Sequence, residues 1–197
     1  MSNEKKVTIL EIDEKNFISH ILNKGAVKQD EFLQRRFVYD FNPVIPNKWI
    51  YLRTNGEKTT LTIKEIKDRN AIDETGALEV EVDDFDVTNE ILNKLGFIAS
   101  NYQEIYRKVF ILDNTEISID SWPLIPVYAE VEGKSDRDVI NTLNKLGYSL
   151  NDVTALDIEF IYEKIYGIDM KRIKKLKFSD SSYESMVEHN KQVKQKL

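Results

Sequence analysis

The stretch "WIYLRTNGEKTTLTIKEI", from Trp49 to Ile66, decides the fold because it predicts two antiparallel strands joined by a tight turn. The Asn-Gly pair at its centre is the strongest short-range signal for a hairpin. Side chains alternate between the two faces of a strand, so each predicted strand has one apolar face and one polar face. The polar faces carry two basic residues, Arg53 and Lys64. The hairpin alone leaves two interpretations open: a solvated sheet face, or a face that binds an anion.

Composition excludes several kinds of functional site. The chain has 197 residues, of which 41% are apolar, enough for one domain of fair size or a domain with an appendage. The absence of cysteine excludes disulfides, a thiolate nucleophile and a cysteine-based zinc site. With only His20 and His189, a histidine-rich metal site or a Ser-His-Asp triad is hard to assemble. The net charge of −6 argues against general nucleic-acid binding, although a local basic cluster could still hold a small phosphorylated ligand.

Neither a leader nor a membrane segment is indicated. The N-terminal sequence "MSNEKKVTIL" lacks the apolar core of a signal peptide. No run approaches the roughly 18 apolar residues that a membrane span needs. We therefore expect a cytoplasmic protein that does not bind membranes.

A near-repeat marks three helix ends: "ILNKG" at 21–25, "ILNKLGF" at 91–97 and "TLNKLGY" at 142–148. Helical spacing of apolar residues precedes each copy. The predicted helices begin after Asp13, near Asp86 or Thr88, and at the capping-box-like pair Ser135 and Asp138. A glycine in each copy supplies the left-handed residue that ends a helix at low cost. The predicted helix ends are Gly25, Gly96 and Gly147, and a further short helix is predicted over Asp157–Ile168.

Strand patterns lie between these helices, and most of them are connected as hairpins. They predict an α+β domain with a large antiparallel sheet or barrel. The predicted strands are Val7–Ile12, Gln34–Phe41, Lys48–Thr54, Thr59–Ile66, Ala77–Val82, Tyr106–Leu112, Glu116–Asp120 and Val127–Glu132.

Charges of both signs recur on the polar faces of these strands. Alternation puts Glu79 with Glu81 on one strand, and Glu130 with Glu132 on another. Carboxylates two residues apart can share Mg²⁺ or Mn²⁺, and basic residues on facing strands could hold the phosphates that the metal bridges. The alternative is a two-layer sheet with one wet face. In "IYRKVFIL" the periodicity does not decide whether Arg107 or Lys108 belongs to the polar face.

Several segments, taken together and in order, resemble the CYTH superfamily, also called triphosphate tunnel metalloenzymes. They are "LQRRFVYDF", "PNKWIYLRTNGEKTTLTIKEI", "LEVEVDDF", "IDSWPLIPVYAEVEG" and "IYEKIYGID". The chain looks most like the bacterial branch labelled class IV adenylyl cyclase-like. The resemblance runs from about Glu4 to Asp169 and implies an eight-stranded antiparallel β-barrel, flanked by helices, with a charged tunnel inside. The expected domains are a tunnel domain over 1–169 and a Lys-rich C-terminal helix or tail over 170–197.

The resemblance also implies a site. It assigns phosphate binding to Arg36, Arg53, Lys64 and Arg107, and so selects Arg107 over Lys108. It assigns the binding of Mg²⁺ or Mn²⁺ to Glu4, Glu79, Glu81, Asp120, Glu130 and Glu132. The ligand would be a small molecule with a triphosphate, such as ATP or tripolyphosphate. Attack by water would hydrolyse it, and attack by the ribose 3′-hydroxyl of ATP would give cyclic AMP; no single catalytic residue is assigned.

The first strand departs from the family pattern E-x-E-x-K. In "EKKVT", Glu4 keeps the first acid, Lys6 stands where the second glutamate belongs, and Thr8 stands where the lysine belongs. A cation in place of a carboxylate disfavours a nearby metal. Tyr106 also removes a positive charge that is common in the family. Three functions stay open: a phosphohydrolase or adenylyl cyclase-like enzyme, a triphosphate- or polyphosphate-binding module with impaired catalysis, and a structural protein. The sequence also leaves open whether the chain forms a homodimer.

Overall fold

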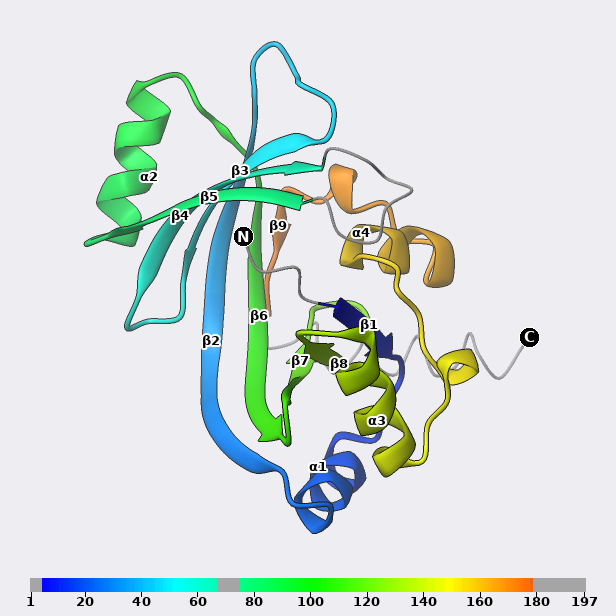
Figure 1. Ribbon diagram of the computed structural model, residues 1–197. Coiled ribbons are helices and arrows are strands. Elements are labelled where there is room, and N and C mark those ends of the chain that lie inside the picture. Colours follow the sequence, from blue (N-terminus) through cyan, green and yellow to red (C-terminus); the bar gives the residue numbers. More distant parts are fainter. Residues whose placement is uncertain (1–4, 67–74, 179–197) are drawn as a thin grey trace. The chain divides into compact units, whose positions relative to one another are not determined.

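The computed structural model describes residues 5–66 and 75–178 (Figure 1). Glu4 and the stretch 179–197, which includes most of the predicted tail, lie outside the described residues. The N-terminal half contains β1 (Lys5–Ile9), α1 (Glu14–Asn23), β2 (Val27–Asp40), β3 (Lys48–Thr54), β4 (Thr59–Ile66), β5 (Thr75–Val82) and α2 (Phe85–Lys94). The C-terminal half contains β6 (Ala99–Leu112), β7 (Thr115–Ser121), β8 (Tyr128–Gly133), α3 (Asp136–Leu146), α4 (Ile158–Phe160) and β9 (Lys175–Leu176), with short helical turns at Leu150–Asp152, Ile161–Ile165 and Met170–Arg172.

The strands form an antiparallel sheet in the order β1-β8-β7-β6-β2-β3-β4-β5, and the two-residue β9 adds to β6 in parallel. The predicted α+β class with a large antiparallel sheet is therefore confirmed. The predicted barrel is not confirmed, because β1 and β5 are the two ends of this order and the described residues form no ladder between them.

Contacts divide the chain into two compact units. Among the described residues, unit 1 contains 32–66, 75–104 and 171–177, and unit 2 contains 5–31, 105–170 and 178. The long strands β2 and β6 contribute residues to both units.

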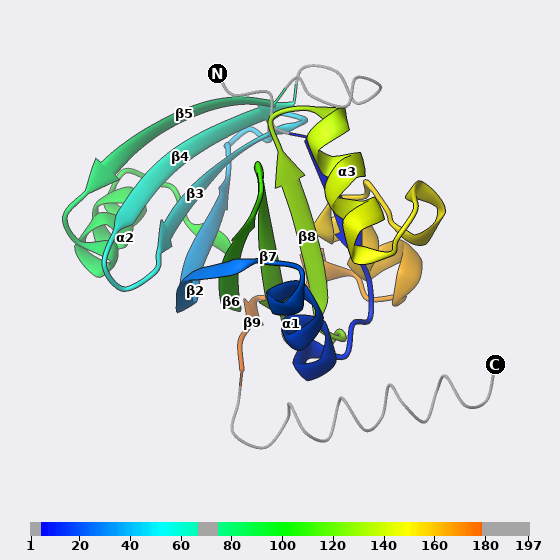
Figure 2. The ribbon, with the colours of Figure 1, turned by 60° about the horizontal axis from the view of Figure 1, so that its bottom comes forward.

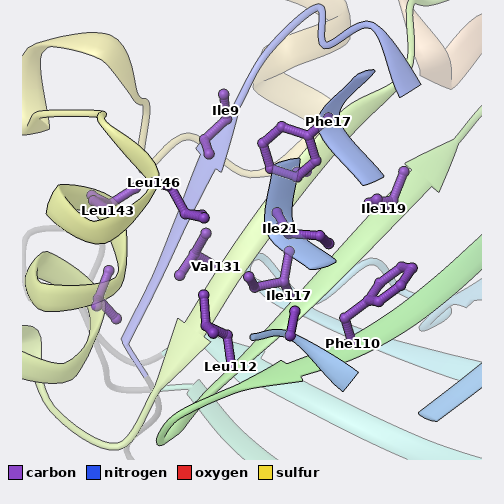
Figure 3. Packing of buried hydrophobic residues seen from close by; sticks show 13 residues of the cluster. Ile9, Phe17, Ile21, Phe110, Leu112, Ile117, Ile119, Val131, Leu143 and Leu146 are labelled. Carbon is purple, nitrogen blue, oxygen red and sulfur yellow. The ribbon is translucent and has the colours of Figure 1, made fainter. Parts of the chain in front are cut away.

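Unit 2 has its core on the apolar face of β1, β7 and β8, which α1 and α3 cover (Figure 3). Figure 2 shows α3 running alongside β8. Ile117, Ile119 and Val131 on the strands are almost completely buried, and Ile21 of α1 and Leu143 of α3 pack with them. The helices bury these residues because their apolar side chains recur at helical spacing.

Unit 1 has a smaller core between the strands and α2. Ile50 and Leu52 of β3 are buried with Phe85 and Leu92 of α2, as the alternation of the hairpin predicts. The apolar face of β5 differs from this pattern, because Leu78 is 74% exposed even though it alternates with the acidic residues. A strand at the edge of a sheet can alternate apolar and polar side chains even where no helix or strand packs against its apolar face.

The helix ends confirm the capping signals. Asp13 caps α1 through a hydrogen bond from the Asn16 backbone, and Ser135 caps α3 through one from the Asp138 backbone. The second helix begins slightly earlier than predicted, because Asp84 and not Asp86 or Thr88 is its cap. All three glycines of the near-repeat have positive φ, and Gly147 itself is the left-handed cap that ends α3. The predicted helix over 157–168 is present as α4 and the turn that follows it.

Two strands begin seven residues earlier than the sequence predicts. β2 begins at Val27 instead of Gln34, and the added stretch is mostly exposed on both faces, so it shows no alternation. β6 begins at Ala99 instead of Tyr106, and there the buried face carries polar residues, Asn101 and Gln103. Polar residues on a buried face hide a strand from any pattern based on hydrophobicity.

The segment that follows 169 partly joins unit 1. Leu176 is buried, and β9 pairs with β6 at Tyr102 and Gln103. The division at 169 stays a prediction. Among the described residues, no helix combines the length and apolar character needed to cross a membrane.

The core of unit 2 predicts a strong response to truncation at Leu143, which is only 1% exposed. Leu143→Ala should lower the free energy of unfolding by about 2–5 kcal/mol, because it removes buried methyl groups and leaves a cavity. Urea denaturation followed by circular dichroism measures this loss. Leu150→Ala is the matched control, since Leu150 is 58% exposed and should change stability by less than about 0.5 kcal/mol. Equal losses in the two variants would contradict the assigned core.

Candidate functional site

The polar side of β2, β3, β4 and β5 in unit 1 forms a mixed charged surface, here called the basic face. Strand register brings its members together: Arg36 lies opposite Arg53, and Arg53 lies opposite Thr60. In the neighbouring row Tyr51 lies opposite Thr62, which lies opposite Glu79. The basic face consists of Arg36, Tyr51, Arg53, Thr60, Thr62, Lys64 and Glu79.

Two hydrogen bonds hold Arg53 on this face. Its Nε donates to Thr60 Oγ1 at 3.1 Å, and its Nη2 donates to Glu79 Oε2 at 3.0 Å. Thr62 donates to the same glutamate oxygen at 2.7 Å. Because two hydrogen bonds fix the plane of the guanidinium while 46% of the side chain stays exposed, its remaining N–H groups are available to a ligand.

Tyr51 lies between the other two cations. The Arg36 guanidinium carbon lies 4.9 Å from the centre of the Tyr51 ring, and the Lys64 ammonium lies 5.8 Å from it. Both distances are within the range of cation–π attraction. Arg36 also donates to Gln103 through Nε. The three basic residues predicted on β2, β3 and β4 are thus brought onto one surface of one unit.

The two acids of β5 each pair with a basic residue. Partial burial raises the pKa of Glu79, but the hydrogen bond from Thr62 and the charge of Arg53 lower it by more, so the net shift is downward. Glu81 pairs with Lys58 at 3.0 Å on the exposed end of the hairpin.

A second constellation, here called the acidic network, lies on the polar side of β1, β6, β7 and β8 in unit 2. Arg107 of β6 donates to both oxygens of Asp120, from Nε at 2.7 Å and from Nη2 at 2.6 Å. The same Nη2 lies 3.2 Å from Glu130 Oε2, and Lys6 Nζ lies 2.8 Å from Glu130 Oε1. Tyr128 also donates to Asp120, at 3.3 Å.

Burial and charge act in opposite directions in the acidic network. Burial lowers the pKa of Arg107, but the adjacent Asp120 carboxylate raises it by more, so the guanidinium stays charged. Burial likewise raises the pKa of Asp120, and Arg107 opposes this shift. For Lys6 burial lowers the pKa, whereas Glu130 raises it and prevails. Burial is the main cause that raises the pKa of Tyr128, and the charge of Asp120 raises it further. The Tyr128 hydroxyl therefore remains a donor.

The structure answers the question that periodicity left open on β6. Arg107 lies with Asp120 and Glu130, whereas Lys108 pairs with Glu14 and Glu31. Glu132 lies opposite Lys6 in the strand register. Of the predicted site residues, Glu4 alone lies outside the described residues.

The carboxylates predicted as metal ligands mostly bind the chain's own cations. Asp120 and Glu130 pair with Arg107, Glu79 pairs with Arg53, and Glu81 pairs with Lys58. Within 5–66 and 75–178, no group of three or more acidic or histidine side chains is placed to hold a metal ion. Because Mg²⁺ and Mn²⁺ require several oxygen ligands, the described residues do not fit the divalent ion that the resemblance implies.

Several contacts of these two surfaces were not predicted. Alternation already placed Thr60 and Thr62 beside Lys64, but it gave no reason to expect hydrogen bonds to Arg53 and Glu79. Gln103, the partner of Arg36, was missed because the start of β6 was not recognised. The link from Lys6 to Glu130 joins residues 124 positions apart, and no local pattern carries such information.

Comparison with solved structures gives the fold its context. A "putative adenylate cyclase" of Vibrio parahaemolyticus has a TM-score of 0.68 against this chain. The two are 14% identical over 82% of this chain and 98% of that one. A conserved hypothetical protein of Pyrococcus furiosus gives 0.66, with 21% identity over 79% of this chain and 97% of that one. A chain of the Schizosaccharomyces pombe Mediator head module gives 0.51, with 14% identity over 73% and 92%.

These likenesses concern the fold. The chain titled a "putative adenylate cyclase" shares this architecture over most of both chains. No family model matches the sequence, and no curated protein matches it. Because the same architecture also occurs in the Mediator head module, function has to be argued from the residues of the site.

Asp120 is completely buried, which predicts a large effect of removing its charge. Asp120→Asn should lower the free energy of unfolding by about 3 kcal/mol, because it removes the fully buried bidentate partner of Arg107 and leaves the guanidinium only the longer contact to Glu130. Chemical denaturation of the purified variant measures the loss. Asp113→Asn is the matched control, since Asp113 pairs with Lys145 at 2.8 Å but is 62% exposed, and it should cost at most about 1 kcal/mol. A loss no larger than that of the control would refute the buried pair.

The lowered pKa of Glu79 predicts a pH-dependent contribution to stability. A carboxyl group whose pKa is lower in the folded state stabilises the fold when the pH is above the ordinary pKa of 4.5. This contribution is lost as the pH falls through the pKa of the folded state. Wild-type protein should therefore exceed Glu79→Gln in stability at neutral pH, and the difference should shrink as the pH falls below 4.5. Urea denaturation of both proteins across this range tests the sign; a difference that grows on acidification would contradict it.

Proposed function

We propose that the chain binds a triphosphate-containing anion on the basic face of unit 1. The observation that carries this proposal is the cross-strand pair of Arg36 and Arg53, two like charges directly opposite each other. Like charges in this relation destabilise a sheet unless something compensates for them. Glu79 balances part of this charge at Arg53, and a polyanion between the two guanidinium groups would add a charge-assisted contact to each of them.

The partners of the two arginines support this function. Arg53 is held through Nε and one Nη nitrogen, and Arg36 through Nε, so their orientations are fixed before any ligand arrives. Preorganised donors bind more tightly because little conformational freedom is lost on binding. Lys64, on the next strand, adds a third cation beside Tyr51. Three cations on one surface suit a ligand with several phosphates better than one with a single carboxylate.

The likeness in fold to an adenylate cyclase-like protein supports the choice of ligand class, because such a protein would act on the triphosphate of ATP. Within unit 2, Arg107 is proposed as a phosphate-binding residue, since 26% of its side chain remains exposed while Asp120 holds it. We propose in addition that the protein turns the bound ligand over, either by hydrolysis or by cyclisation. Most of the described carboxylates that the resemblance assigns to a metal pair with basic side chains instead.

Calorimetric titration with tripolyphosphate tests the basic face. Arg53→Ala and Lys64→Ala should each weaken binding at least about tenfold, because a charge-assisted hydrogen bond is worth about 1.5–3 kcal/mol. Neither change should unfold the chain, since both side chains are partly exposed. Phosphate release measured on the same samples separates turnover from binding.

Matched controls lie on the opposite side of the same strands. The Arg35 guanidinium lies 4.9 Å from the centre of the Phe85 ring, and Lys48 pairs with Glu65 at 3.7 Å. Arg35→Ala and Lys48→Ala should leave the affinity within about twofold of the wild type. Unchanged affinity in both Arg53→Ala and Lys64→Ala would remove the assignment, and the absence of any binding by wild-type protein would refute the proposed function.

A further inference from the structure

Lys6 lies among the acids of the acidic network in unit 2. Its ammonium lies 2.8 Å from Glu130 Oε1, and its strand-register partner is Glu132. Arg107 approaches the other oxygen of Glu130 at 3.2 Å. Both oxygens of Glu130 are therefore engaged by cations that belong to the chain itself.

Asp120 is closed to an incoming ion in the same way. Both of its oxygens accept hydrogen bonds from Arg107, and its side chain is completely buried. A divalent ion could reach it only by displacing the guanidinium and opening the buried pair. The bidentate geometry makes that exchange costly, because two parallel charge-assisted bonds would be lost together.

The ammonium of Lys6 also acts against a cation at the neighbouring acids. Glu116 and Glu132 lie opposite each other on β7 and β8, and Lys6 lies opposite Glu132 on β1. A divalent ion bound by these acids would be repelled by the positive charge of Lys6. The positive charge of Lys6 thus already balances part of the negative charge of the acidic network.

We propose that Lys6, together with Arg107, replaces a divalent metal ion as the counter-ion of the acidic network, and that the protein binds its anionic ligand without Mg²⁺ or Mn²⁺. Lys6 is the residue that determines this property, because Arg107 is committed to Asp120. The part that concerns the ligand rests on the proposed function of the basic face, whereas the part that concerns the metal stands independently of it.

Direct titration with Mn²⁺, followed by the electron paramagnetic resonance signal of the free ion, tests the metal part without any phosphate ligand. Wild-type protein should leave Mn²⁺ free up to millimolar concentration. Lys6→Glu should bind Mn²⁺ at least tenfold more tightly, because it adds a carboxylate and removes the competing ammonium. Specific binding by wild-type protein, or the same weak binding in Lys6→Glu, would overturn the proposal.

Two further variants guard against trivial explanations. Lys6→Gln removes the ammonium without adding a charge. This variant should also bind Mn²⁺ more tightly than wild-type protein, so the proposal can still be tested if Lys6→Glu does not fold. Lys145→Glu is the matched control, because Lys145 forms an ion pair of the same 2.8 Å length with Asp113 elsewhere in unit 2. An equal gain in Lys145→Glu would show a nonspecific charge effect and would overturn the role of Lys6.

Titration of wild-type protein with tripolyphosphate in EDTA and then in excess Mg²⁺ tests the ligand part. We expect affinities within about threefold of each other. Binding that occurs only with Mg²⁺ would overturn metal independence while leaving the proposed function intact. No binding in either buffer would refute the proposed function and the ligand part with it, whereas the Mn²⁺ titration would still decide the metal part.

Discussion

The alternation of side chains along each strand is the constraint on which the rest of the structure depends. In unit 2 the strand β7 puts Ile117 and Ile119 into the core and Asp120 onto the other face. In unit 1 the strand β3 buries Ile50 and Leu52 and presents Arg53 on the polar side. One geometric rule therefore builds both the cores and the two charged surfaces, and a one-residue slip of register would exchange them.

The two charged surfaces use this rule with different results. On the basic face, Arg53 keeps nearly half of its side chain exposed, so it can combine internal hydrogen bonds with contact to a ligand. In the acidic network, Asp120 is fully buried, and its charge is balanced by Arg107 within the protein. Exposed ion pairs contribute little to stability, whereas a buried carboxylate requires its partner. The first surface is thus suited to binding, and the second fixes the positions of its own charges.

Much of the architecture could be predicted from local signals. The Asn-Gly turn, the alternation in β3 and β4, and the caps at Asp13 and Ser135 are decided by neighbours in sequence, and the structure agrees with each. The same signals failed at the beginning of β6, where Asn101 and Gln103 face inward and make the strand look polar. Tertiary partners, and not hydrophobicity, accommodate those two side chains: Asn101 donates to the Ile173 carbonyl, and Gln103 accepts from Arg36.

The sequence by itself determined the α+β class, the hairpin at 48–66, and the separation of apolar from charged faces, because these features depend on residues close together in the chain. It also indicated that Arg36, Arg53 and Lys64 share a polar side. Only the tertiary structure decided which charges meet: that Arg107 contacts both Asp120 and Glu130, and that Lys6 reaches Glu130. Ion pairs between distant strands depend on strand order and register across the sheet, and a linear pattern of residues does not specify either.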